Sequence, residues 1–230
     1  MNQVWRDTFL SWATMDEYER RLDVTQGIIA DRLAGSHKPY VAYSGGKDSL
    51  AMLHLVLQQK PEILVYHWDY GRSYIPYAIH RRIIENAEAI GASNLRVETS
   101  SLYRTLGRRA VNVMGRHYIG RLIPELAREG YDLSFVGLRK GESVKRRNRI
   151  VVRRELSVIP ECWPLAEWTW MDVWAYIVSN NLPYLAHYDR VADLVGYDRS
   201  RFTTLFDPEF KHLGTESVDN VVYWRHRNEQ

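Results

Sequence analysis

The sequence predicts an α/β fold in which a parallel sheet is flanked by helices, and three observations predict it. Short apolar runs recur at 39–43, 63–68 and 133–136. The segments between them have the 3.6-residue spacing of amphipathic helices. Strands that alternate with helices in this way form right-handed βαβ units, which build parallel sheets. The run at 63–68 is largely apolar, as expected of a strand buried on both faces.

The expected elements follow one another at short intervals along the chain. A helix at 16–34 has acidic residues near its start and ends at Gly35. The later elements are a strand at 39–43, a helix at 48–59, a break at Pro61, a strand at 63–68, a helix at 75–91, a weak strand at 95–97, a helix at 117–129 and a strand at 133–136. We expect a mobile loop at 100–116.

The chain divides into three expected parts that form one structural unit. Residues 1–37 are an N-terminal helical extension, and residues 38–160 form the α/β domain that contains the sheet. Residues 161–230 form a smaller C-terminal lobe packed on the sheet, where four tryptophans crowd into 163–174 and loops replace the strand–helix alternation. We interpret these tryptophans as core residues and not as a platform for stacking nucleic-acid bases.

The composition is that of a soluble globular protein, with 45% hydrophobic and 26% charged residues. No run reaches the roughly 18 apolar residues of a membrane span, and the N-terminus lacks the order of a secretory signal. We therefore expect a cytoplasmic protein with no membrane partner. The single cysteine, Cys162, excludes an intramolecular disulfide and, within one chain, a cysteine-ligated iron–sulfur cluster or zinc site.

The first strand leads into the next helix through six residues, Ser44-Gly45-Gly46-Lys47-Asp48-Ser49. Two adjacent glycines let the backbone turn tightly, so that successive N–H groups point at an anion beside the positive end of the helix dipole. The pattern is not Walker A, which needs four residues between its first glycine and Gly-Lys-Ser/Thr. It predicts a phosphate cradle, against the alternative of a glycine turn followed by a chance Lys-Asp-Ser. We expect Lys47 to be solvated and to contribute little to stability.

Other candidate ligand residues follow the second strand. In an open parallel sheet, ligands bind outside the carboxyl ends of the strands. The backbone of 68–71 can hydrogen-bond an adenine edge there, and Trp68 or Tyr70 can stack on the ring. The alternative makes Trp68 a core aromatic and 69–71 a plain turn.

A basic segment follows the strand at 133–136. Residues 139–154 carry eight Lys/Arg and one Glu, a charge of +7, so the remaining residues carry −4 of the overall +3. Because arginine forks match phosphate or sulfate oxygens, this local charge indicates an anionic ligand at one site. Arg139, directly after Gly137-Leu138, is the favoured contact. The alternatives are a solvated basic face and a nucleic-acid patch.

The order of these motifs resembles the phosphoadenosine phosphosulfate (PAPS) reductase family of the PP-loop adenine nucleotide α-hydrolase superfamily. The matching residues are 40–49, Asp69-x-Gly71, Gly137-Leu138-Arg139-x-x-Glu142-Ser143, Trp163-Pro164-Leu165, Trp168-Thr169-x-x-Asp172-Val173-Trp174, Leu182-Pro183-Tyr184 and Tyr188-Asp189. The resemblance implies a Rossmann-like, HUP-type sheet that binds ATP or a sulfonucleotide, PAPS or adenosine phosphosulfate. The nucleotide-binding residues that it implies are Tyr43, Ser44, Gly45, Gly46, Lys47, Asp48, Ser49, Trp68, Asp69, Gly71, Gly137, Arg139, Glu142 and Ser143.

One departure from this family decides the predicted reaction. Reductases of the family use a C-terminal cysteine as the nucleophile, but no cysteine follows Tyr188-Asp189 in this chain. Cys162 precedes the Trp-rich segment, beside Trp163 and Pro164, where a buried structural thiol is expected. A self-contained reductase is therefore disfavoured.

The leading hypothesis is an enzyme that cleaves ATP to AMP and pyrophosphate to adenylylate a substrate. Its predicted catalytic residues are Lys47, Asp48 and Arg139. The cradle and Lys47 would hold the β and γ phosphates, a Mg²⁺ near Asp48 would bridge phosphate oxygens, and Arg139 would offset charge at the α-phosphorus. Asp48 has a second interpretation, in which it caps the following helix.

Three alternatives stay open at this stage. The first is a sulfonucleotide enzyme that works with an external thiol donor such as thioredoxin. The second is an ATP-binding subunit of a nucleic-acid sulfur-modification system, in which 139–154 and the arginines of 104–121 hold a polynucleotide. The third is a nucleotide sensor that does not cleave ATP. The sequence makes no prediction of the oligomeric state.

Overall fold

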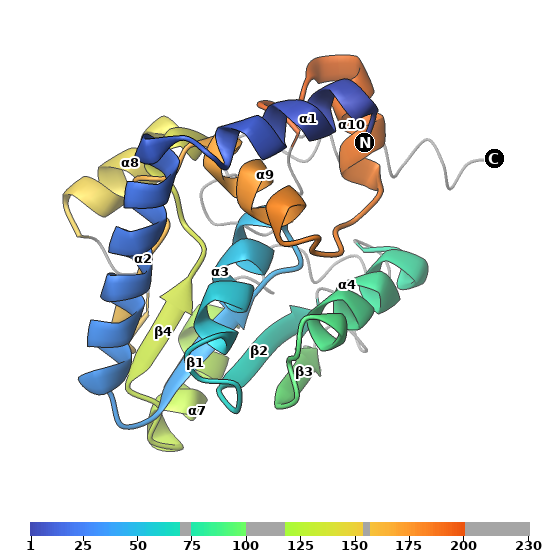
Figure 1. The fold of residues 1–230 in the computed structure, drawn as a ribbon. Helices are drawn as coiled ribbons and strands as arrows, with labels where there is room; N and C mark the ends of the chain where they lie inside the picture. The colour runs from blue at the N-terminus through green and yellow to red at the C-terminus, as the bar shows by residue number, and fades with distance from the viewer. Residues whose placement is uncertain (70–74, 100–117, 154–156, 201–230) are drawn as a thin grey trace.

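The computed structural model describes residues 1–69, 75–99, 118–153 and 157–200 (Figure 1). Its five-stranded sheet has the order β3-β2-β1-β4-β5, and every neighbouring pair is parallel. The strands are β1 (Pro39–Tyr43), β2 (Leu64–Asp69), β3 (Leu95–Thr99), β4 (Leu133–Val136) and β5 (Glu161–Cys162). The predicted α/β fold with a parallel sheet is thus confirmed. The predicted mobile loop and Gly71 lie outside the described residues.

The helices flank this sheet. Those before β3 are α1 (Gln3–Trp12), α2 (Asp16–Ala34), α3 (Lys47–Leu57) and α4 (Tyr77–Ala89). Those after it are the π-helix η2 (Tyr118–Leu122), α7 (Ile123–Arg128), the 3₁₀ turn η3 (Lys140–Glu142), α8 (Val144–Val151), α9 (Trp170–Ser179) and α10 (His187–Val195). The predicted helix at 16–34 has the bounds of α2, whereas α1, α8, α9 and α10 were not predicted individually.

The register of the central strands brings their carboxyl ends to one edge of the sheet. Tyr43, the last residue of β1, is the partner of His67 in β2, and Ala42 is the partner of Val136, the last residue of β4. The segments that begin at Ser44, Trp68 and Gly137 therefore start close together. This is the arrangement that the sequence predicts for the candidate site.

The two faces of the sheet bury different cores. Val41, Tyr43 and Val65 point into a large core shared with α3 and α9. Tyr40 and Tyr66 point to the other face, into a smaller core with α7. This alternation follows from the period of two in a strand. It explains why β1 and β2 read as apolar runs.

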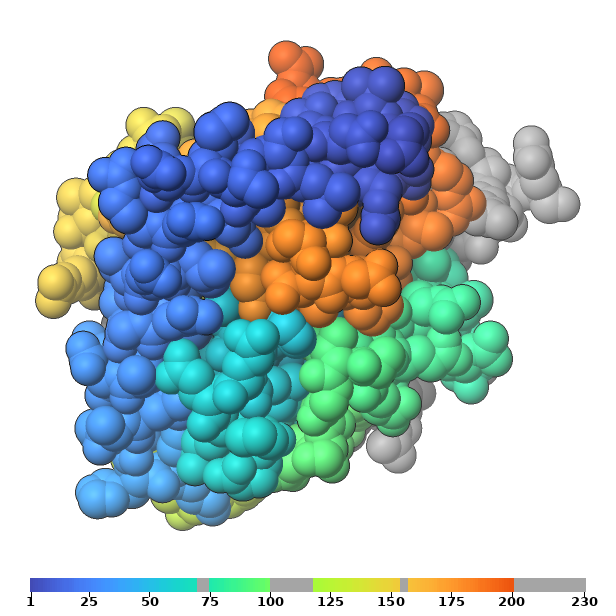
Figure 2. Space-filling view, viewed as in Figure 1, coloured from blue at the N-terminus to red at the C-terminus, as the bar shows by residue number. Residues whose placement is uncertain are grey.

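The expected C-terminal lobe contributes to the sheet itself, because β5 begins at Glu161 and pairs with β4. Helix α9 then packs against α1 and α3, and Figure 2 shows the N-terminal helices lying over this part of the molecule. Helix α9 starts with a capping box, in which the Thr169 and Asp172 side chains bond each other's backbone N–H groups. Trp168 and Trp174 are buried, as the core interpretation predicts, whereas Trp163 and Trp170 are only partly buried.

Asp172 joins three helices although its side chain is fully buried. Its carboxylate accepts hydrogen bonds from Trp12 Nε1 of α1 at 2.8 Å and from Arg21 of α2 at 2.7 Å, besides those from Thr169. A buried carboxylate needs such partners, because its desolvation is otherwise costly. The N-terminal extension is therefore fixed to the start of α9.

Within the described residues, no helix is both long enough and apolar enough to cross a lipid bilayer.

Asp172→Ala should lower the free energy of unfolding by about 2–4 kcal/mol, because it leaves the half-buried donors of Trp12 and Arg21 without an acceptor. Glu17→Ala is the matched control, since Glu17 also pairs with Arg21 but is 61% exposed. We expect it to cost less than about 1 kcal/mol. Urea denaturation of both variants measures the difference. Equal effects would contradict the role given to Asp172.

Candidate functional site

The turn after β1 depends on glycine at its first bend. Gly45 has φ +82°, and a Cβ atom there would lie 2.6–2.7 Å from side-chain atoms of Ile83 on α4. Such an approach is possible only without a side chain. Gly46 then adopts an extended conformation as the N-cap of α3. Helix α4 thus packs directly on the predicted cradle.

The two serines of the cradle bond to the loop itself. Ser44 Oγ and Ser49 Oγ are 3.0 Å apart, and Ser49 Oγ donates to the carbonyl oxygen of Gly46 at 2.9 Å. The Ser44 N–H donates to Ser49 Oγ at 3.3 Å. These bonds hold the ends of the loop together around the start of α3.

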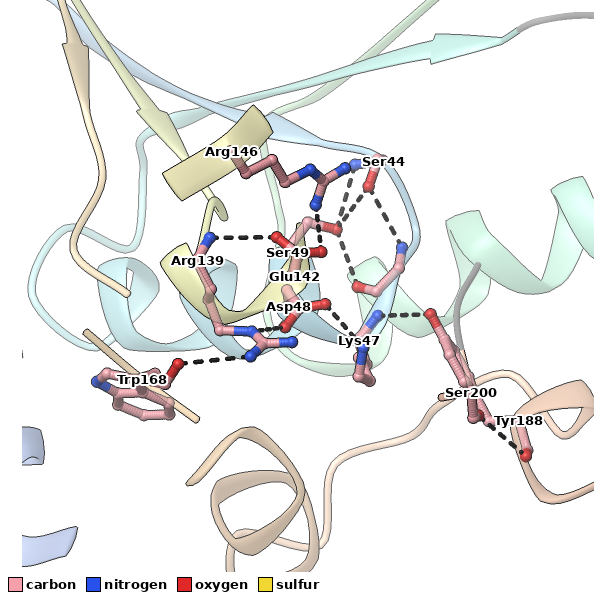
Figure 3. A network of polar contacts seen from close by, with 11 residues as sticks. Ser44, Lys47, Asp48, Ser49, Arg139, Glu142, Arg146, Trp168, Tyr188 and Ser200 are labelled. Atoms are coloured by element: carbon pink, nitrogen blue, oxygen red, sulfur yellow. Dashed lines mark hydrogen bonds and ion pairs between the residues drawn. The ribbon is translucent and has the colours of Figure 1, made fainter. Parts of the chain in front are cut away.

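A cluster of three buried charges forms the centre of the site (Figure 3). The Asp48 carboxylate accepts from Arg139 Nε through one oxygen and from Lys47 Nζ, at 3.0 Å, through the other. Lys47, Asp48 and Arg139 are exposed by only 3%, 8% and 4%. The expectation of a solvated Lys47 is therefore wrong, because its ammonium group is buried against Asp48. The three predicted catalytic residues are in contact.

Burial and the neighbouring charges shift the pKa values of all three residues of the cluster. Burial alone would raise the pKa of Asp48, but the charges of Arg139 and Lys47 outweigh it and hold that pKa well below its usual range. Burial lowers the pKa of Lys47, against the opposing effect of Asp48. Burial also acts against the Arg139 charge, but Asp48 and Glu142 raise the pKa of Arg139 above its usual value. Two basic side chains thus flank one carboxylate beside the cradle.

The same contacts bear on the predicted Mg²⁺ ligand. Both oxygens of Asp48 are engaged by cations, so this pairing does not fit metal coordination. Asp48 does not cap α3 either. Across residues 1–69, 75–99, 118–153 and 157–200, no group of three His, Cys, Asp or Glu side chains is arranged to hold a metal ion.

The end of β4 lies directly against the start of α3. A Cβ atom at Gly137 would lie 2.9 Å from both the Cα and the N atom of Ser49, so only glycine fits. Arg139 follows two residues later, and its guanidinium group also donates to the Trp168 carbonyl oxygen at 3.4 Å. The close approach at Gly137 is what brings Arg139 to Asp48.

Glu142 and Ser143 support this arrangement from η3 and α8. Glu142 accepts from the Arg139 N–H at 3.1 Å and forms an ion pair with Arg146. Ser143 caps α8 by accepting from the Arg146 N–H at 3.1 Å. The prediction that they bind ligand is not tested by these contacts, which are internal.

Arg146 is a candidate ligand residue that the sequence reasoning did not single out. Its guanidinium group points toward Ser44 in Figure 3, and its side chain is 19% exposed. The sequence does contain a signal for this residue, since the four-residue spacing of Glu142 and Arg146 predicts an ion pair on one side of a helical turn.

A cavity of about 360 Å³ opens beside the charge cluster. Lys47, Arg139 and Glu142 line it together with segments from β4–α8 and from the start of α9. The other lining residues are Lys140, Gly141, Ala166, Glu167, Trp168, Thr169, Trp170 and Asp198. Of the predicted ligand-binding residues, Lys47, Arg139 and Glu142 therefore share this cavity.

Among the residues predicted to bind adenine, those that the structure describes do not line this cavity, and Tyr70 lies outside the described part of the chain. Tyr43 is 2% exposed and its hydroxyl donates to the Ile83 carbonyl oxygen at 3.2 Å. The Trp68 ring is buried, with its centroid 5.9 Å from that of Tyr118, so Trp68 is a core aromatic. Asp69 Oδ1 lies 3.8 Å from His80 Nε2. Adenine binding at this end of β2 stays a prediction that depends on backbone groups.

Cys162 lies in β5 and is 4% exposed. Burial raises the pKa of its thiol to about 11. The reactive form of cysteine is the thiolate, which is scarce at neutral pH for such a group. Cys162 is therefore a structural residue of the core, as predicted.

Comparison with known proteins covers most of the chain. The family model of the phosphoadenosine phosphosulfate reductase domain matches residues 38–215. A solved structure of phosphoadenylyl-sulfate (PAPS) reductase from Candida auris, in a phosphate complex, aligns with a TM-score of 0.52 and 15% identity. The alignment covers 73% of this chain and 84% of that one. At this identity the likeness supports the fold alone.

Two curated relatives show similar levels of identity. An uncharacterised protein from Methanocaldococcus jannaschii is 28% identical over 200 residues, which cover 79% of this chain and 39% of the relative. Sulfate adenylyltransferase subunit 2 from Mycobacterium bovis is 28% identical over 200 residues, which cover 71% of this chain and 63% of the relative. The chain thus spans less than two thirds of the length of either relative.

The native Cys162 thiol should react very slowly with a water-soluble disulfide reagent at pH 8, because only about one thiol in a thousand is ionised at a pKa near 11. The same protein in guanidinium chloride should react fully within minutes. Absorbance of the released chromophore follows both reactions. Rapid labelling of the folded protein would contradict a structural thiol and reopen the reductase hypothesis.

Proposed function

The chain belongs to the phosphoadenosine phosphosulfate reductase family, and on this premise we propose that it is an enzyme that binds ATP at residues 44–49. It breaks the bond between the α-phosphorus and the oxygen bridging to the β-phosphate of ATP, releases pyrophosphate and transfers the AMP moiety to a substrate. Relatives in this family include proteins named as a sulfate adenylyltransferase subunit and as a PAPS reductase. The first of these names supports an ATP-using reaction and a partner subunit.

The observation that carries this proposal is the charge cluster of Lys47, Asp48 and Arg139 at the wall of the cavity. It sets two basic side chains against one carboxylate, lies at the N-terminus of α3, and is largely shielded from water. Charges fixed in this way act strongly on an incoming polyanion, because little solvent screens them. A triphosphate is the ligand class that fits such a site.

The reaction follows from these groups. An oxygen of the acceptor attacks the α-phosphorus, the bond between that phosphorus and the oxygen bridging to the β-phosphate breaks, and its electron pair leaves with pyrophosphate. Lys47, the cradle N–H groups and Arg146 hold the leaving phosphates. Arg139 offsets the charge that develops at the α-phosphorus. Asp48 keeps Lys47 and Arg139 in position.

Cys162 favours this reaction over a self-contained reductase. It is the only cysteine of the chain, and it is buried in the sheet with a raised pKa. A sulfonucleotide reductase would need an external thiol donor. That enzyme is the second candidate, since it would use the same cradle.

The contacts of the basic segment do not favour a polynucleotide ligand. Four of its cations are paired with carboxylates of the same chain, as Arg139–Asp48, Lys140–Glu167, Arg146–Glu142 and Arg149–Glu161. Polynucleotide binding depends on many cations that face solvent and phosphate. Four of the cations that suggested a nucleic-acid patch therefore form ion pairs within the protein.

Thermal unfolding with a nucleotide panel tests the proposed function. The panel is ATP with Mg²⁺, AMP, adenosine phosphosulfate, PAPS and phosphoadenosine phosphate. ATP at 100 times its dissociation constant should add about 2.7 kcal/mol to stability, and pyrophosphate release should follow when the acceptor is supplied. Stabilisation confined to the 3′-phosphorylated compounds would instead select the sulfonucleotide enzyme.

Arg146→Ala should weaken ATP binding about ten- to hundredfold, because a charge-assisted hydrogen bond contributes about 1.5–3 kcal/mol. Arg147→Ala is the matched control, since Arg147 is the next residue of α8 but is exposed, whereas the Arg146 side chain is only 19% exposed. Calorimetric titration with ATP compares the two variants with the wild type. Equal losses in both would show a diffuse charge effect in place of a contact by Arg146.

A further inference from the structure

The first N–H group of α3 is bonded to a residue from the other end of the chain. The Lys47 N–H donates to the hydroxyl oxygen of Tyr188 on α10 at 3.0 Å (Figure 3). The first N–H groups of a helix have no partner within the helix. In a phosphate-binding helix they are the groups that meet the anion. A neutral oxygen of the C-terminal region therefore occupies a donor of the cradle.

Tyr188 also contacts the side chain of the same lysine. Lys47 Nζ lies 5.7 Å from the centroid of the Tyr188 ring. Tyr188 is 1% exposed, so it covers this part of the cradle from water. Both the backbone and the side chain of Lys47 thus depend on the position of α10.

Helix α10 is held in place by contacts outside the cradle. The Tyr188 ring packs edge-on against Trp174, with centroids 5.4 Å apart, and its carbonyl oxygen accepts from Ser200 Oγ at 3.3 Å. The next residue, Asp189, accepts from the hydroxyls of Tyr184 and Tyr197. The Tyr188 hydroxyl therefore reaches the cradle from an independently supported helix.

We propose that Tyr188 is a latch. Without nucleotide its hydroxyl accepts the hydrogen bond from the Lys47 N–H, and on nucleotide binding a phosphate oxygen replaces it as the acceptor. The inference rests on the proposed function, since it concerns the same cradle. One N–H group makes one strong hydrogen bond, so the phosphate and Tyr188 compete for it. An anionic acceptor makes the stronger bond. Nucleotide binding therefore releases Tyr188 and loosens α10.

This competition couples the cradle to the C-terminal region. By linkage, whatever stabilises the docked α10 weakens phosphate binding, and phosphate binding weakens the docking of α10 by the same factor. A residue that only supported the cradle would have the opposite effect, because its loss would weaken binding. The two roles are thus distinguished by the direction of the change in affinity.

Tyr188→Phe tests the latch, because it removes the hydroxyl and keeps the ring against Trp174. We expect this variant to bind inorganic tripolyphosphate and ATP about two- to tenfold more tightly than the wild type, as follows from the loss of one competing neutral hydrogen bond. Calorimetric titration measures both ligands. Equal or weaker binding would overturn the latch.

Tyr184→Phe is the matched control. Its hydroxyl donates to Asp189 at 3.1 Å, and its ring packs edge-on against Trp174 at 5.1 Å. It removes a support of α10 but keeps the bond between Tyr188 and Lys47, so it should tighten binding by a smaller factor than Tyr188→Phe does. A second variant, Ser200→Ala, removes the donor to the Tyr188 carbonyl. It should change affinity in the same direction as Tyr188→Phe by a smaller factor.

Hydrogen exchange provides the second measurement. Saturating tripolyphosphate should speed amide exchange in α10 of the wild type and leave α9 unchanged. Slower or unchanged exchange in α10 would overturn the latch. Wild-type and Tyr188→Phe proteins that bind ATP equally would overturn the latch and leave the proposed function intact. Tighter tripolyphosphate binding by Tyr188→Phe, with no binding of ATP by any variant, would overturn the proposed function and support the latch.

Discussion

The buried carboxylate of Asp48 connects the parts of the molecule that make the candidate site. It lies between Lys47, on its own helix, and Arg139, which follows β4, 91 residues along the chain. None of the three charges is stable alone in this environment, because each has lost most of its hydration. Together they bind the start of α3 to the end of β4. The position of the cavity follows from this contact.

Parallel strand order makes that contact possible. Because β1 is central and pairs with both β2 and β4, the turns that leave these three strands meet at one edge. Two glycines then set the distances. Gly45 admits α4 beside the cradle, and Gly137 admits the backbone of β4 against α3. The charge cluster lies where these two close approaches bring the start of α3 and the segment after β4 together.

The sequence predicts the parts of the structure that local patterns control. Apolar runs predict β1, β2 and β4, and amphipathic spacing predicts α2. Helix α9 escapes prediction because it is apolar on nearly all sides, buried between α1 and α3, and so has no clear polar face. The glycines and Lys47 are found from their order alone. The burial of Lys47 could not be predicted, because it depends on the ion pair of Asp48 with Arg139 and on Tyr188, which is 141 residues away from Lys47.

The carboxylate of Asp172 has a consequence for biosynthesis. It joins Trp12 of α1 to α9, across 160 residues of sequence. A ribosome that adds about 5–20 residues per second needs about 8–32 s to cover that interval. During this time α1 has been made but its partner has not, and its apolar face is exposed. Helix α1 therefore completes its packing only after α9 has been made.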